Sequence, residues 1–171
     1  MTTPVDLTVA LDRLADMLHT GHHALALSTA DGRTLTFDGR GVSDLLRLLT
    51  TEPQTLRGAL VADKVVGKAA AALMALGQVR AVRADVMSQG AWQLLTAPLP
   101  PDSAATRPDH VSYTTLTDHI INRTQTDWCP MERACHAAPT PDECLLRIRA
   151  KLCEMHAGTH NPTNTTTNQH T

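Results

Sequence analysis

The stretch GALVADKVVGKAAAALMAL, residues 58–76, is the strongest fold signal in this sequence. Its first five residues, Gly58–Ala62, form a short apolar run that is typical of a strand buried on both faces. The alanine-rich remainder predicts a helix from Asp63 to Leu76, closed by Gly77. A strand that leads directly into a helix is a common ligand site in α/β proteins. The first turn of such a helix offers free backbone N–H groups and the positive end of its dipole.

The segments on either side of this stretch continue the alternation of strands and helices. Apolar residues recur at helical spacing in some segments and at strand spacing in others. The expected elements are a helix over 6–20, strands over 23–29 and 33–37 around the Asp31-Gly32 turn, a helix from Ser43 that Pro53 ends, a strand over 79–86 and a helix from Ser88 to Leu95. This order predicts a sheet with helices packed on its faces.

The part of the chain from residue 98 onward contains eight of the ten prolines and all four cysteines. The expected elements there are an exposed Pro-rich loop over 98–109, a short strand near 111–113, a helical piece over 115–121, an irregular segment over 122–128, a helix opened by Pro130, and a last helix from the capping box Thr140–Glu143 to about His156. We expect a single domain over 1–157. The polar, low-complexity tail over 158–171 is expected to be disordered.

Composition excludes several classes of function. The chain has 171 residues, 42% apolar and 19% charged, with a formal net charge of −2. That charge gives no reason to expect nucleic-acid binding, and the four aromatic residues offer few rings on which bases could stack. No apolar run is long enough to cross a membrane, and the N-terminus lacks the pattern of a signal peptide. We therefore expect a cytoplasmic protein without a nucleic-acid or membrane partner.

Three blocks taken in order, ADKVVGKAAA (62–71), IINR (120–123) and CPME (129–132), resemble one family of small prokaryotic proteins of unknown function. The segment GHHALALSTADGRTLTFDGRGVSDLL (21–46) resembles the opening hairpin and helix of the same family. This family is grouped with the cytidine deaminase-like superfamily. The resemblance implies an α/β fold, a three-layer α/β/α sandwich with a central mixed sheet. It implies no known activity.

The superfamily name raises the question of a zinc-dependent deaminase, which the residues disfavour. That chemistry needs a His or Cys ligand and a Glu at one helix start, and Pro-Cys-x-x-Cys at the next. Here the first position reads Ala62-Asp63-Lys64, and the later block, Cys129-Pro130-Met131-Glu132, has the reversed dipeptide without a second cysteine. No C-x-x-C pair occurs in the chain. We expect no metal site and no cofactor.

Asp63, Lys64 and Lys68 are the first set of candidate site residues. Two of the three lysines in the chain occur here, four residues apart, so a helix would place both ammonium groups on one face. An anionic ligand between them would relieve their repulsion. In the alternative interpretation, Asp63 is an N-cap worth about 1 kcal/mol and Lys64 is a solvated first-turn residue.

The second set comes from the later blocks. Cys129 precedes the helix opened by Pro130, a position that favours the reactive thiolate, and Glu132 is a candidate general base. Asn122 and Arg123 are candidate ligand-binding residues, since a guanidinium group binds carboxylate or phosphate. The alternatives are a buried apolar cysteine, an N3 capping glutamate and a surface ion pair.

These residues predict a metal-independent enzyme or binding protein for a nucleotide-like or otherwise anionic small molecule. Asp63, Lys64, Cys129 and Glu132 are the predicted catalytic residues, and Lys68, Asn122 and Arg123 the predicted ligand-binding residues. The alternative is a non-catalytic interaction module in which the same motifs stabilise a homo-oligomer. The sequence names neither the substrate nor the reaction.

Overall fold

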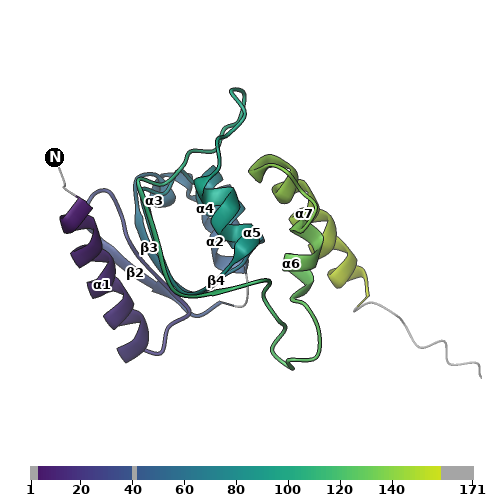
Figure 1. Ribbon diagram of the computed structural model, residues 1–171, viewed down its shortest axis with the longest axis horizontal. Coiled ribbons are helices and arrows are strands. Elements are labelled where there is room, and N and C mark those ends of the chain that lie inside the picture. The colour runs from purple at the N-terminus through teal and green to yellow at the C-terminus, as the bar shows by residue number, and fades with distance from the viewer. Residues whose placement is uncertain (1–3, 40–41, 159–171) are drawn as a thin grey trace, which may run out of the picture.

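The computed structural model describes residues 4–39 and 42–158, which form a mixed five-stranded sheet with helices (Figure 1). The strand order is β2-β1-β3-β4-β5; β1 is antiparallel to both β2 and β3, whereas β3, β4 and β5 are parallel. The predicted α/β class and mixed sheet are thus confirmed. In chain order the elements are α1 (Pro4–Thr20), β1 (Leu25–Ser28), β2 (Thr34–Phe37), α2 (Ser43–Thr51), α3 (Pro53–Leu56), β3 (Leu60–Val66), α4 (Lys68–Leu76), β4 (Ala81–Ser88), α5 (Gln89–Thr96), β5 (His110–Thr117), α6 (Pro130–Cys135) and α7 (Pro141–Ala157).

One face of the sheet is covered by α1, which contacts β1, β3 and β4. Its leucines recur at helical spacing, and all of them are buried on the side that meets the sheet. Leu14 and Leu18 pack with Ala26 and Ala62, which are alanines of the strands. Small side chains on the strands allow the helix to approach the sheet closely.

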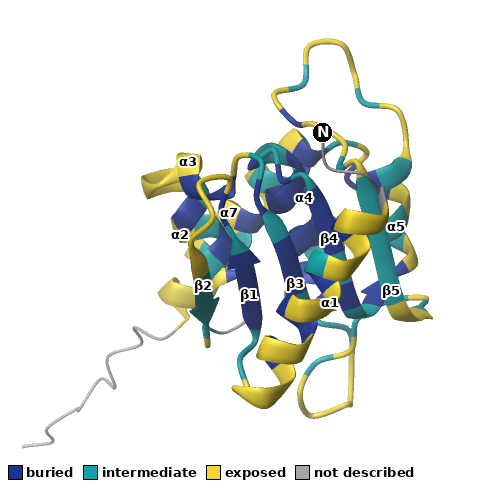
Figure 2. Ribbon diagram, turned by 90° about the vertical axis from the view of Figure 1, so that its left-hand side faces the viewer, coloured by how far each residue is buried: buried dark blue, intermediate teal, exposed yellow. Residues whose placement is uncertain are grey.

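The opposite face is covered by α4, behind which α6 and α7 pack (Figure 1). Every residue of α4 from Ala69 to Ala75 is buried (Figure 2). This helix contacts the sheet through β3 and also contacts α2, α5, α6 and α7. A helix that is apolar all round is typical of such an enclosed position. The alanine run therefore reflects close packing.

The structure corrects the predicted start of this helix. β3 continues through Asp63 and Lys64 to Val66, and α4 begins at Lys68 after Gly67, whose backbone is extended. Val65 and Val66 pair with Val86 and Met87 of β4. β-branched side chains favour the extended state, and the parallel partner strand supplies the hydrogen bonds that a local reading of the sequence cannot show.

A similar difference occurs at β5. The predicted helical piece over 115–121 is wrong, because β5 runs to Thr117 and pairs with β4 through Thr115 and Val86. Pro53 ends α2, as predicted, and also occupies the first position of the short helix α3.

Several local predictions are confirmed. Ser88 accepts a hydrogen bond from the backbone N–H of Ala91, Thr140 accepts one from that of Glu143, and Pro130 opens α6. None of the helices within the described ranges has the length and hydropathy needed to cross a membrane. The predicted tail falls, apart from Gly158, outside the described residues.

Candidate functional site

A pocket of about 580 Å³ lies where the end of β3 meets the start of α4, the segment after β5, α6 and α7. Six of the seven predicted site residues line it, and they come from two distant parts of the chain. We call this cavity the central pocket. Its lining consists of Ala24, Gly39, Val42, Ser43, Asp63, Lys64, Val65, Gly67, Ala69, Ala70, Ile120, Ile121, Asn122, Arg123, Cys129, Pro130, Met131, Glu132, Leu152 and Met155.

Asp63 lies on the pocket face of the sheet. It stands opposite Leu25 of β1 and Ala84 of β4, and both partners belong to the hydrophobic core that includes α4. Residues directly opposite each other on paired strands share a face, and successive residues alternate between faces. Lys64 also lines the pocket, but alternation directs its side chain toward the face that α1 covers.

The Asp63 carboxyl group exchanges its proton near neutral pH. Burial raises its pKa to about 7, and the nearby charge of Asp85 acts in the same direction. The backbone N–H of Val65 donates a 2.9 Å hydrogen bond to the carboxylate, which partly opposes this rise. A carboxyl group with a strongly shifted pKa in a cleft is a candidate for proton transfer.

Glu132 joins the two sequence motifs into one structural unit. Its side chain is 4% exposed, and its Oε2 accepts a 2.6 Å hydrogen bond from the backbone N–H of Lys68, the first residue of α4. A Cβ atom on Gly67 would lie 2.5 Å from this oxygen, so a side chain there would displace the Glu132 carboxylate. The carboxylate of α6 thus caps the N-terminus of α4, where negative charge is favoured.

Lys68 strengthens the same connection from the opposite direction. Its ammonium Nζ donates a 2.8 Å hydrogen bond to the carbonyl of His136, the residue at the C-terminal end of α6. Cations are favoured at the C-terminal end of a helix. Lys68 is not among the described residues that line the central pocket. Its predicted role in ligand binding stays a prediction.

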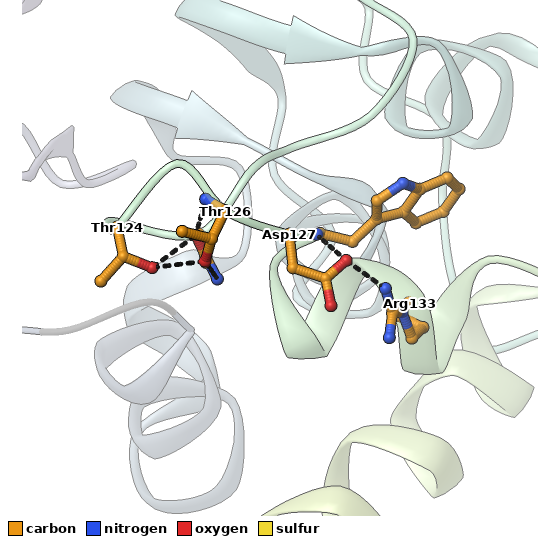
Figure 3. Close-up of polar contacts among 6 residues, drawn as sticks. Thr124, Thr126, Asp127 and Arg133 are labelled. Carbon is orange, nitrogen blue, oxygen red and sulfur yellow. Dashed lines mark hydrogen bonds and ion pairs between the residues drawn. The ribbon is translucent and has the colours of Figure 1, made fainter.

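Asn122 organises the turn that brings Arg123 to the pocket. Its Oδ1 accepts hydrogen bonds from the Thr126 backbone N–H at 3.1 Å and the Thr124 hydroxyl at 3.0 Å. The two threonine hydroxyls also contact each other, and Asp127 accepts from Arg133 of α6 (Figure 3). The Asn122 side chain therefore holds the loop, as residues with short amide side chains commonly do in turns.

Arg123 and Cys129 complete the polar part of the lining. Arg123 is exposed, and the described residues supply no ion pair to its guanidinium group. Cys129 is half-buried at the N-cap of α6, and its backbone N–H donates a 2.8 Å hydrogen bond to Ile120. Arg123 is therefore available to an anionic ligand, while Cys129 lines the same space.

Sequence reasoning missed the apolar character of the pocket and a pair of buried thiols. Val65, Ile121 and Met155 line the pocket and are 44%, 51% and 48% exposed, respectively. No periodic pattern in the sequence links these three residues. Cys135 and Cys144 are both fully buried, and the Cys135 thiol donates a 3.7 Å hydrogen bond to the backbone carbonyl of Cys144. The interaction between the two side chains, together with burial, raises the pKa of Cys135, and the same interaction lowers the pKa of Cys144.

The arrangement suits proton transfer and anion binding in a mostly apolar cavity. Asp63 offers a proton near neutral pH, Arg123 offers a guanidinium group, and Glu132 is already engaged by α4. Among the described residues, no three His, Cys, Asp or Glu side chains gather as a metal-ligand set.

Comparisons with known proteins identify the family of this chain. Residues 13–152 match the family model described as TM1506, a domain of unknown function (DUF1893). A solved relative is the crystal structure of a DUF1893 family protein (TM1506) from Thermotoga maritima, with a TM-score of 0.67 and 22% sequence identity over 83% of this chain and 90% of that chain. That likeness concerns the fold. No curated protein matches the chain. Since the family model spans most of its length, the chain belongs to the DUF1893 family.

Proposed function

We propose that the protein binds a small anionic molecule in the central pocket and that Asp63 exchanges a proton with it, without a metal. The observation that carries this proposal is the convergence of Asp63, Arg123 and Cys129 on one pocket of about 580 Å³. Ligand pockets of this kind have volumes of roughly 300–1,000 Å³ and combine an apolar lining with a few polar groups.

Within this proposal, the residues have different roles. Arg123 binds the anionic group, Asp63 is the acid–base group, and Glu132 and Lys68 hold α4 and α6 in position. Lys64 contributes less than Arg123, because strand alternation turns its side chain away from Asp63. Cys129 stays a candidate nucleophile. The three-layer sandwich, the cytidine deaminase-like grouping and a cytoplasmic location are expectations that accompany the proposal.

A thermal-shift and calorimetric panel of AMP, inorganic phosphate, citrate and octanoate tests the proposal. At least one of these anions should raise the melting temperature of the wild-type protein. Arg123→Ala should weaken its binding about tenfold or more, as expected when a charge-assisted contact is lost. Arg107→Ala, an exposed arginine in the loop between α5 and β5, is the matched control and should bind normally. If no member of the panel binds, the proposal is wrong.

A second candidate function is a homo-oligomeric interaction module. The exposed apolar side chains of Val65, Ile121 and Met155 at the pocket favour it, since such patches often mark protein contacts. Light scattering distinguishes the two candidates. An oligomer that Met155→Glu dissociates would support the module, whereas a monomer that binds an anion would support the binding protein.

A further inference from the structure

The central pocket has an aliphatic interior built by several elements. Ala69 and Ala70 come from α4, Met131 from α6, and Leu152 and Met155 from α7. Ile120 and Ile121 close the side formed by the segment after β5. Aliphatic side chains on converging elements provide an environment for hydrocarbon, which gains about 25 cal/mol for each Å² removed from water.

The same lining does not suit a nucleobase. Phe, Tyr and Trp are absent from the described residues that line the pocket. Proteins that bind bases commonly stack them on aromatic rings. The sequence suggested a nucleotide-like or otherwise anionic ligand. The aliphatic lining favours an anionic ligand with an aliphatic body over a nucleotide.

The charged residues that line the pocket suit a ligand that carries a single negative charge. The described lining has two acidic residues, Asp63 and Glu132, and two cationic residues, Lys64 and Arg123. Strand alternation turns the Lys64 side chain toward the face that α1 covers, so Arg123 is the cation available to a ligand. The Glu132 carboxylate is engaged by the backbone N–H of Lys68 at the start of α4. Asp63, with its raised pKa, carries only part of a charge at neutral pH. A polyphosphate would have too few cationic partners here.

The mouth of the pocket is itself apolar. Val65, Ile121 and Met155 are each roughly half exposed while they line the cavity. A bound hydrocarbon chain would cover these side chains.

We propose that the ligand is an aliphatic chain with a single anionic head group, the chain packed against α4, α6 and α7 and the head group bound by Arg123. This inference rests on the proposed function and narrows its ligand class. A fatty carboxylate and an alkyl phosphate both fit this description. The experiment below distinguishes between them.

Cysteine footprinting on the full-length protein tests this inference with an internal control. Cys129 lines the pocket, whereas Cys153 is exposed on α7 outside the lining. Butanoate, hexanoate, octanoate, octyl phosphate, octanamide and AMP are added below their micelle concentrations. Iodoacetamide labelling of each cysteine is then followed by mass spectrometry. We expect octanoate or octyl phosphate to slow labelling of Cys129 and to leave Cys153 unchanged.

Chain length gives the quantitative expectation. Each buried methylene group should strengthen binding about fourfold. Octanoate should therefore protect Cys129 at concentrations about sixteenfold lower than hexanoate. The neutral octanamide should protect less than octanoate, and Arg123→Ala should remove that difference. Met155→Glu should weaken protection, whereas Leu146→Glu, at a 65% exposed position of the same helix outside the pocket, should not.

The other outcomes separate this inference from the proposed function. Protection by AMP with a flat chain-length series would overturn the aliphatic ligand and leave anion binding in place. Equal protection by octanamide and octanoate would overturn the anionic head group. If none of the anions protects Cys129 or binds in calorimetry, the inference and the proposed function are both wrong. The relative protection by octanoate and octyl phosphate identifies the preferred head group.

Discussion

Asp63 shows how its position in the sheet changes the chemistry of a common residue. The sequence suggested an N-cap or an acid–base group at a helix start, but the residue lies within β3, opposite Leu25 and Ala84. Its apolar surroundings disfavour the charged form and raise the pKa of its carboxyl group to about 7. An N-cap at the solvent-exposed start of a helix would have been stabilised as a carboxylate instead.

The pH dependence of folding tests this environment. The folded-state pKa of about 7 lies above the ordinary value of 3.8, so the folded protein binds more protons between these pH values. The contribution of the protonated Asp63 carboxyl group to the stability of the fold is therefore complete below pH 3.8 and is lost as the pH rises to 7. At pH 8, Asp63→Asn should thus increase the free energy of unfolding relative to wild type by up to about 4 kcal/mol. Screening of the carboxylate charge by solvent makes the increase smaller.

Urea unfolding at pH 4 and pH 8 measures the difference, which should be small at the lower pH. Asp31→Asn is a control of opposite sign, because the Thr29 hydroxyl lowers the pKa of the exposed Asp31. That variant should gain nothing at pH 8. Equal effects of Asp63→Asn at the two pH values would contradict a raised pKa of the Asp63 carboxyl group.

At the scale of elements, the connection between α4 and α6 explains why two motifs distant in the sequence occur together. Gly67, Lys68 and Glu132 meet at the start of α4, and Lys68 also reaches the end of α6. The helix predicted from Asp63 to Leu76 would have placed Gly67 in its interior. In the structure it is the N-cap of α4, and its missing side chain leaves room for the Glu132 carboxylate.

A double-mutant cycle tests this connection. Glu132→Ala should destabilise the protein by about 2–3 kcal/mol, because it removes a buried charge-assisted hydrogen bond. Gly67→Ala should destabilise by about 1–2 kcal/mol, because the new methyl group displaces the same carboxylate. The two effects should be less than additive, by about 1 kcal/mol, when measured by urea unfolding. Fully additive effects would show that Gly67 and Glu132 act independently. Gly90→Ala, which meets only Lys68 carbon atoms at 3.3 Å or more, is the comparison.

At the scale of the whole molecule, the sheet separates the face that α1 covers from the face that carries the candidate site. The described lining of the central pocket contains no residue of α1, whose leucines are buried against the opposite face. The pocket exists because the end of β3, the start of α4, the segment after β5, α6 and α7 converge there.

Leu11→Ala tests this separation. Leu11 is 1% exposed, so its truncation should destabilise the protein by about 2–5 kcal/mol. Octanoate or another bound anion should nevertheless bind with unchanged affinity in calorimetry at a temperature where the variant is folded. Met131→Ala, at a buried residue that lines the pocket, should reduce both stability and affinity. A loss of affinity in Leu11→Ala would show that the two faces are coupled.

Much of the candidate site was predictable as a set of residues, but its geometry was not. Asp63, Arg123, Cys129 and Glu132 carry recognisable side chains at strand ends and helix starts, so they stand out in the sequence. The sequence could not show that Glu132 would be engaged by the backbone of Lys68, or that Asn122 would hold its own turn. The first contact joins residues that are far apart in the sequence, and the second depends on the conformation of one loop.

The sequence by itself determined the local structure: the helices with their caps at Ser88 and Thr140, the turn at Asp31-Gly32, and the alternation of strands and helices. Such signals act between residues a few positions apart, and their physical causes lie within the segment. Only the tertiary structure decided that β3 extends to Val66, because β4 supplies its hydrogen-bond partners. It also decided the raised pKa of Asp63 and the apolar lining of the pocket. The lining brings together side chains that are more than sixty positions apart in the sequence, and the pKa of Asp63 depends on its burial and on the charge of Asp85. No local pattern of the sequence encodes these proximities.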